Sequence, residues 1–284
     1  MLTVLIYGAV TSAIFAMLAV GFTLIFGVAR ILNLAHGTFY AIGAYAAFTL
    51  TAVYKMPLLP AAIISVAFVA AFGVVMERVL VRPLRHSALA VLMITLAVSL
   101  TMEQVLFLVF GSQSKNVPAF INHPIYIHGV SVDGQRLVAL GVGVALIAAL
   151  WLFIQRTRLG SAILAISQDP EAAQYMGIPS NRIFSIVMGL SAAIAGAAGV
   201  IASPFLTVRP TMDLIPMITA FSVVIVGGLG SIPGSILAAC LIGYSETIVA
   251  FYFNPQWTGA VSLLAVLLTL ILRPSGLMGK PISS

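Results

Sequence analysis

Apolar runs of about 20 residues recur along the whole chain and are separated by short polar segments. A helix of about 20 residues crosses about 30 Å of hydrocarbon, and in lipid the backbone must satisfy its own hydrogen bonds. Composition agrees, because 61% hydrophobic and 7% charged residues are far from the usage of soluble domains. We therefore predict an all-α, multi-pass membrane protein with eight or nine transmembrane helices in one transmembrane domain, residues 1–284.

Nine apolar segments fit this prediction. They cover residues 4–28, 37–53, 59–76, 88–110, 137–154, 183–201, 214–226, 235–253 and 258–272. The first is predicted to be a span rather than a cleaved signal, because no cationic segment precedes it. The seventh and ninth are short for full crossings, which predicts that they are irregular or supported by neighbouring helices. Between the spans, residues 111–135 are predicted to be an extramembrane cap and residues 77–87 a basic loop.

Lysine and arginine residues are unevenly distributed between the two sides of this pattern. With the N-terminus outside, nine cations fall inside: Arg30, Arg78, Arg82, Arg85, Arg156, Arg158, Arg182, Arg273 and Lys280. Four fall outside: Lys55, Lys115, Arg136 and Arg209. Cytoplasmic loops carry the excess of cations, so the count predicts an N-out/C-in orientation. The net charge of +6 therefore reflects topology, and no dense basic patch indicates a nucleic-acid partner.

Residues 167–179, SQDPEAAQYMGIP, form a polar island in the apolar second half of the chain. Asp169 is a good N-cap, Pro170 suits the first helical position, Glu171 favours the positive end of the dipole, and Gly177 provides a stop. These signals predict a short helix of about two turns. Such a helix is not stable alone in water, so it must pack against another surface.

One face of this predicted helix carries Ala172, Tyr175 and Met176, at spacings of three and four residues. A small notch beside two adaptable side chains suits docking into a groove of another protein. The alternative is a helical turn packed against its own membrane domain.

The order Glu171-Ala172-Ala173, three residues, then Gly177 resembles the EAA loop of bacterial ABC-importer permeases. In that family the short helix couples the membrane subunit to its ATPase. The resemblance implies a cytoplasmic coupling loop over residues 155–182. Its implied coupling residues are Asp169, Pro170, Glu171, Ala172, Ala173, Tyr175, Met176 and Gly177.

Several separated segments resemble the branched-chain amino-acid permeases of ABC importers, and most closely the first of the two permeases in such systems. They are NLAHGTFYAIGAY from Asn33, RPLR from Arg82, EAAQYMGI from Glu171 with GLSAAIAGAAG, VVIVGGLGSIPG from Val223, and LRPSGLMG from Leu272. The resemblance implies a translocation path for branched-chain amino acids in the bacterial cytoplasmic (inner) membrane. It also implies a second homologous permease, two cytoplasmic ATP-binding subunits and an extracytoplasmic solute-binding protein, with ATP bound by the partners and no cofactor in this chain.

Polar residues within the apolar segments are candidates for the translocation path. They are Asn33, His36, Thr38, Tyr40, Glu103, Gln104 and Glu246. An ionisable group within the membrane is costly, which favours a functional role. Structural alternatives are open, because Glu103 could reach the interface and a histidine near a helix start is often a satisfied structural group.

The segment GGLGSIPG, with Gly227, Gly228, Gly230 and Gly234, is predicted to be a tight structural turn. It does not match a dinucleotide loop, because Pro233 takes the place of the third glycine and no strand precedes it.

Cys240 lies in an apolar run and is predicted to be a small core residue.

Two alternatives to this function stay open. The same motifs allow a permease for urea, short amides or other amino acids, and the hydropathy also fits a self-sufficient secondary transporter or channel. The latter needs ion ligands within the membrane, for which the sequence offers Glu103 and Glu246. No catalytic triad, metal-ligand spacing or phosphate-binding loop is present, so we predict neither an enzyme nor a metal site.

Overall fold

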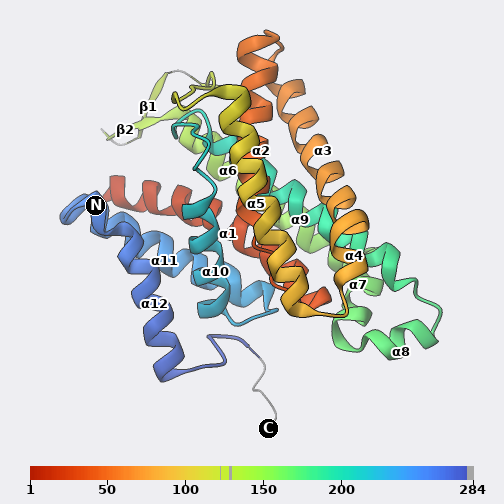
Figure 1. Ribbon diagram of the computed structural model, residues 1–284. Helices are drawn as coiled ribbons and strands as arrows, with labels where there is room; N and C mark the ends of the chain where they lie inside the picture. Colours follow the sequence, from red (N-terminus) through yellow and green to blue (C-terminus); the bar gives the residue numbers. More distant parts are fainter. Residues whose placement is uncertain (122, 128–129, 280–284) are drawn as a thin grey trace.

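The structure, a computed structural model, describes residues 1–121, 123–127 and 130–279 and is almost entirely helical (Figure 1). Lys280 of the cation count lies outside these residues. The helices are α1 (Leu2–Ala29), α2 (His36–Phe48), the π-helix η1 (Thr49–Val53), α3 (Leu58–Met76), the π-helix η2 (Glu77–Val81), α4 (Arg82–Leu84), α5 (Ala88–Phe110), α6 (Gly134–Arg156), α7 (Arg158–Gln168), α8 (Pro170–Tyr175), α9 (Ser180–Ala202), α10 (Leu214–Gly227), α11 (Ile232–Tyr252), the 3₁₀-helix η3 (Pro255–Trp257) and α12 (Thr258–Leu272). Strands β1 (Pro124–Ile127) and β2 (Val130–Asp133) form an antiparallel hairpin.

Each of the nine predicted apolar segments lies on a helix, which confirms the all-α membrane architecture. Within the described residues, seven helices are long and apolar enough to cross a membrane: α1, α3 with η2 and α4, α5, α6, α9, α11, and η3 with α12. The predicted basic loop at 77–87 is wrong, because the chain stays helical to Leu84. Glu77 is buried there and paired with Arg82 and Arg85, so this carboxylate faces protein, whereas Arg78 is exposed.

Helices α1 and α9 form the centre of the molecule. About four fifths of the apolar window of each is buried (78%), against 22% in α3, α5 and α6. The outer helices therefore present apolar side chains such as Leu108 and Leu241 outward, as a lipid-facing surface requires. Cys240 is also exposed, so its predicted core position is wrong, because this side of α11 faces outward.

Helix α2 begins in the middle of the membrane domain. His36 Nε2 lies 2.9 Å from the carbonyl oxygen of Leu18, near the midpoint of α1, and His36 Nδ1 lies 3.5 Å from Ser191 Oγ, at the midpoint of α9. Further along, a Cβ at Gly43 would overlap Gly196 and a Cβ at Gly199 would overlap the carbonyl of Tyr40. Helix α2 thus runs parallel to the second half of α9, so it is a half-length helix and not the full crossing predicted for 37–53.

Helix α10 also begins at mid-depth and runs in the opposite direction. Its Phe221 ring packs against Phe22 of α1, with centroids 6.0 Å apart, and the turn after it reaches Gly27 near the end of α1. At its start, a Cβ at Gly37 would overlap the carbonyl of Asp213. The first turns of α2 and α10 therefore meet, and the predicted irregularity of segment 214–226 is confirmed as a half-length helix.

The two ends of the domain carry different structures (Figure 1). The β1–β2 hairpin lies at the end where α1 begins, which we call the hairpin side, and α8 lies at the other end, which we call the α8 side. The predicted cap at 111–135 holds the hairpin and is tied to the domain by Gln135, whose Nε2 donates to the carbonyl of Ile201 over 3.3 Å. From the end of α9, residues 203–213 return to mid-depth without forming a helix.

Candidate coupling helix and polar transport site

Helix α8 has the caps that the sequence predicts. The Asp169 side chain accepts hydrogen bonds from the amides of Glu171 and Ala172, both at 3.0 Å, and Pro170 occupies the first helical position. The helix ends before Gly177, which adopts the left-handed conformation with φ of 81°. These local signals fix the beginning and the end of a six-residue helix.

Two large apolar side chains at the end of α8 are almost fully exposed. Tyr175 is 89% exposed and Met176 is 84% exposed, and Ala172 beside them is also exposed. Only Ala173 is buried, and it anchors the helix to the domain. Ala172, Tyr175 and Met176 are thus exposed together, as the sequence predicts, and docking of this face on another protein stays a prediction.

A second helix of this region, α7, has no counterpart in the sequence interpretation, which has only one coupling helix within 155–182. Thr157 caps it, with its Oγ1 accepting from the amide of Gly160 over 3.0 Å. Ile163 and Ile166 are buried while the opposite face is exposed. The signal was available, because apolar residues spaced by three after a threonine cap are typical of an amphipathic helix.

A buried carboxylate ties the end of α3 to the beginning of α9. Glu77 is 1% exposed, forms an ion pair with Arg82 at 3.3 Å and a second, shorter pair with Arg85, and accepts a hydrogen bond from Ser185 Oγ. Burial lowers the pKa of Arg85, and the charge of Glu77 opposes this shift. Arg85 also lies over the Phe184 ring, 3.9 Å from its centroid. Because α9 follows α8 directly, this cluster links α8 to the membrane helices.

A polar cluster lies where α2 and α10 begin. Thr38 Oγ1 donates to Ser99 Oγ over 3.1 Å, and Ser99 donates to Asp213 Oδ2 over 3.1 Å. Ser99 is at the midpoint of α5, so the carboxylate of Asp213 lies at mid-depth. Asp213 directly precedes α10, and its backbone carbonyl lies against Gly37 in the first turn of α2, so the beginnings of both helices lie near this residue. Helix N-termini carry partial positive charge. The sequence does not single out Ser99 or Asp213, because Asp213 lies between the apolar segments 183–201 and 214–226 and Ser99 lies within an apolar run.

The predicted path residues at the start of α2 separate into two groups. Thr38 joins the Asp213 cluster, whereas Asn33, His36 and Tyr40 are fully buried in the packed interior. Asn33 Oδ1 accepts from the amide of Ala35 over 3.1 Å, which stabilises the turn just before α2. His36 is held by Leu18 and Ser191 as described above.

The remaining predicted path residues lie apart from one another. Glu103 is partly exposed and Gln104 exposed, both on α5 toward the hairpin side of Ser99. Glu246 accepts a hydrogen bond from Ser262 and so joins α11 to α12. The prediction that only Glu103 and Glu246 could serve as carboxylates within the membrane is wrong, because Asp213 lies at mid-depth.

Comparisons with known proteins decide the family. The chain is 31% identical to the high-affinity branched-chain amino acid transport system permease protein BraD of Pseudomonas aeruginosa, over 98% of this chain and 95% of BraD. It is 28% identical to the corresponding protein LivH of Escherichia coli, over 96% of this chain and 94% of LivH. The family described as branched-chain amino acid transport system, permease component, matches residues 4–270. The chain belongs to this permease family.

The fold of the permease also resembles a solved structure, PsaBC from Streptococcus pneumoniae in complex with Fab. The TM-score is 0.54 over 95% of this chain and 91% of that chain, at 14% identity, so the likeness concerns the fold alone. Together with the seven long apolar helices, family membership confirms a multi-pass transport protein of the cytoplasmic membrane. Its relatives are permease components, so the permease is not an enzyme.

The glycine-rich turn of the permease has the geometry predicted for it. Gly228 and Gly230 have φ of 101° and 85°, which side chains with a Cβ rarely adopt. A Cβ at Gly227 would overlap the backbone of Gly234, and a Cβ at Gly234 would overlap the backbone of Gly227. The two glycines therefore allow the end of α10 and the start of α11 to lie in close contact. The chain end then returns to this turn: the amide of Leu277 donates to the carbonyl of Val226 over 2.8 Å and helps to cap α10.

Proposed function

We propose that the permease forms the membrane path by which branched-chain or similar amino acids enter the cytoplasm, driven by ATP-binding subunits. The observation that carries this proposal is α8, a capped short helix that presents Tyr175 and Met176 to the exterior of the domain. Exposed apolar side chains of this size indicate a contact with another protein. We assign this contact to a cytoplasmic ATP-binding subunit, which binds the ATP that this chain has no loop to hold.

The contacts of α8 support a route from the ATPase to the membrane helices. Only four residues separate α8 from α9, whose first turns meet the Glu77 cluster. Arg82 and Arg85 also bind Asn181, with Nη2 of Arg82 3.2 Å from its carbonyl and Nη1 of Arg85 3.2 Å from its Oδ1. A displacement of α8 during ATP binding would therefore move the ends of α3 and α9 together, which fits alternating access by rigid-body motion.

The position of residues 203–213 indicates where the path lies. Non-helical backbone at membrane depth is tolerated only where it is buried in protein or lines a water-filled cavity. Yet Leu214 is 63% and Ile215 is 69% exposed at the start of α10, and Arg209 and Thr211 before them are exposed. We propose that a second, homologous permease covers this face, with the path between the two subunits.

The polar cluster on this face fits an amino acid as substrate. The carboxylate of Asp213 would attract an ammonium group, and the positive ends of α2 and α10 would attract a carboxylate, as at the discontinuous helices of other transporters. Glu103 lies on the same helix as Ser99, one turn nearer to the hairpin side. We place the solute-binding protein on the hairpin side, which is outside in the predicted orientation.

The test uses α8 in complexes of the permease with the ATP-binding subunits of its own system. Tyr175→Ala and Met176→Ala remove exposed side chains, so the permease should insert and keep its unfolding midpoint while retaining several-fold less ATPase on purification. Gly177→Val should do the same, because a β-branched residue strains the left-handed conformation by roughly 1–2 kcal/mol.

The matched control is Gly177→Asn, because asparagine tolerates the left-handed conformation. No atom lies within 4 Å of the position that a Cβ would take at Gly177, so the two substitutions differ in backbone strain and shape at an open site. Asparagine should keep ATPase binding and amino-acid uptake. Full ATPase binding and uptake by all the alanine and valine variants would contradict the proposal.

A further inference from the structure

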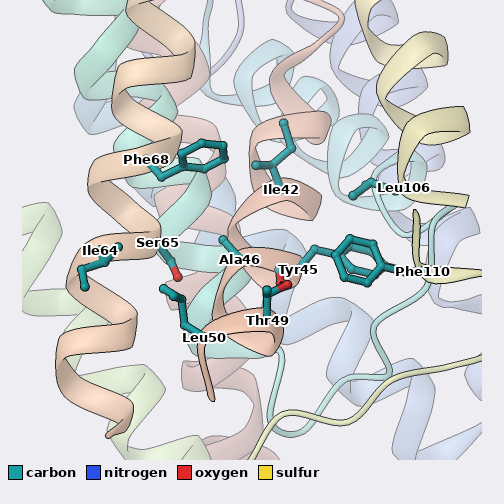
Figure 2. Close-up of a pocket in the computed structure, with 10 residues that line it drawn as sticks. All are labelled: Ile42, Tyr45, Ala46, Thr49, Leu50, Ile64, Ser65, Phe68, Leu106 and Phe110. Carbon is teal, nitrogen blue, oxygen red and sulfur yellow. The ribbon is translucent and has the colours of Figure 1, made fainter. Parts of the chain in front are cut away.

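A cavity of about 350 Å³ lies between α2, α3 and α5 on the hairpin side (Figure 2). Pockets for small molecules commonly have volumes of roughly 300–1,000 Å³. The wall is almost entirely apolar and contains three aromatic rings, those of Tyr45, Phe68 and Phe110. This cavity is separate from the Asp213 cluster and from α8, because it shares no residue with either.

The depth of the cavity follows from the helices that line it. Tyr45 follows His36 by nine residues, so it lies about 13 Å from mid-depth, and Phe110 lies about 16 Å from the midpoint of α5. The hydrocarbon core extends roughly 15 Å on each side of its centre. The cavity therefore reaches from the hydrocarbon to the boundary where lipid ester groups lie.

Tyr45 carries a polar atom that this wall leaves unused. The side chain is 2% exposed, and its hydroxyl has no hydrogen-bond partner among the described residues. Its ring packs against that of Phe110, with centroids 4.6 Å apart. A buried hydroxyl without a partner is costly, so an acceptor on a molecule in the cavity that Tyr45 lines would relieve this cost.

The other polar side chains of the wall are occupied. Ser65 Oγ donates to the carbonyl of Ala61 over 2.7 Å, and Thr49 Oγ1 donates to the carbonyl of Tyr45 over 2.8 Å. The wall thus offers one neutral hydroxyl and no charge, which does not suit the ammonium and carboxylate groups of an amino acid. Thr49 and Leu50 belong to η1, and π-helical turns are frequent at functional sites.

Two apolar side chains at the edge of the cavity are exposed on the outer surface of α3. Ile64 is 45% and Phe68 is 56% exposed on α3, and both line the cavity. An acyl chain of the surrounding bilayer can therefore enter between α3 and α5 without crossing polar surface. The apolar wall, the open edge and the depth all match one class of ligand.

We propose that this cavity binds an acyl chain of a phospholipid from the hairpin-side leaflet, with the ester carbonyl accepting a hydrogen bond from Tyr45. The lipid fills the space between α3 and α5 and supports α5, which otherwise packs mainly on α2, η2 and α4. The site depends only on insertion of the permease in a membrane, so it stands or fails independently of the proposed transport function.

The test compares lipids that differ only in the ester carbonyl. Purified permease is titrated with diester and diether phosphatidylglycerol of the same chain length, and bound lipid is counted by native mass spectrometry. The wild-type protein should bind one diester lipid at this site roughly two- to tenfold more tightly than the diether, the range expected for one hydrogen bond. Tyr45→Phe should remove this preference while keeping the elution profile of the folded protein.

A second pair of variants tests the cavity itself. Ala46→Phe fills the cavity and should abolish the binding of this lipid, whereas Ala148→Phe, in a separate apolar crevice beside α1 and α11, should leave it unchanged. Equal affinity for the two lipids in wild-type protein, or retention of the lipid by a folded Ala46→Phe variant, would overturn the proposal. A diester preference that persists unchanged in Tyr45→Phe would also overturn the role assigned to Tyr45.

Discussion

The carboxylate of Asp213 accepts a hydrogen bond from Ser99 at mid-depth, near the beginnings of α2 and α10. Asp213→Asn keeps an acceptor for Ser99 but removes the charge. We expect this variant to fold normally and to lose uptake roughly five- to tenfold, because a hydrogen bond to a charged group contributes about 1 kcal/mol more than a neutral one. Uptake in proteoliposomes with all subunits present measures this loss.

Asp213→Leu separates the structural part of this role from the electrostatic part. Leucine leaves the Ser99 hydroxyl without its acceptor, so stability should also fall, by about 1–3 kcal/mol. The double variant Asp213→Leu, Ser99→Ala should recover part of that stability and none of the uptake. Wild-type uptake by the asparagine variant would remove Asp213 from the path.

The hydrogen bond of Glu246 with Ser262 favours a structural role, and the path role predicted from the sequence stays the alternative. Ser262, its partner on α12, is 1% exposed and donates to the carboxylate. We expect Glu246→Gln to keep uptake and the unfolding midpoint, because the amide oxygen still accepts this bond. Glu246→Leu should lower stability by about 1–3 kcal/mol, and adding Ser262→Ala should restore part of it. A loss of uptake in a stable Glu246→Gln variant would return this residue to the path.

At the scale of elements, close backbone approach holds α2 against α9. A Cβ at Gly199 would overlap the carbonyl oxygen of Tyr40, so Gly199→Ala must push the two helices apart. We expect a loss of about 1–3 kcal/mol or more, as for other overpacked cores. Gly141→Ala on α6 is the control, because no atom lies within 4 Å of its Cβ position, and it should be neutral or slightly stabilising. Unfolding midpoints and the monodisperse fraction on size exclusion measure the difference, and equal values for the two variants would contradict the assigned packing.

The sequence predicts those elements whose signals are local. Asp169, Pro170 and Gly177 specify the ends of α8 within a few residues, and apolar runs locate the membrane helices. Local signals do not predict that α2 crosses only half of the membrane. Its start at mid-depth depends on contacts of His36 with α1 and α9, which are distant in the sequence. The burial of Glu77 is not visible from its neighbours for the same reason, since its partner Ser185 on α9 is 108 residues away.

At the scale of the whole molecule, the two sides of the domain should meet different partners. The α8 side carries Tyr175 and Met176 on an exposed face, and the hairpin side carries the cap and the start of residues 203–213. The predicted orientation places α8 in the cytoplasm, where an ATP-binding subunit would be. Coupling to an ATPase through α8 requires this orientation. Measuring which side of the membrane α8 faces therefore tests the proposed complex of permease and ATP-binding subunits.

Cysteine accessibility in intact cells measures sidedness directly. A Cys240→Ser background removes the single native thiol, which is exposed. On this background, cysteine in place of Asn116 on the cap should react with an impermeant maleimide from outside, because this position is exposed. Cysteine in place of Ser161 on α7 or Gln174 on α8, also exposed, should react only after the membrane is permeabilised. Labelling of the Gln174 position from outside would place α8 on the wrong side of the membrane for an ATPase, and the excess of cations on the α8 side would then need another cause.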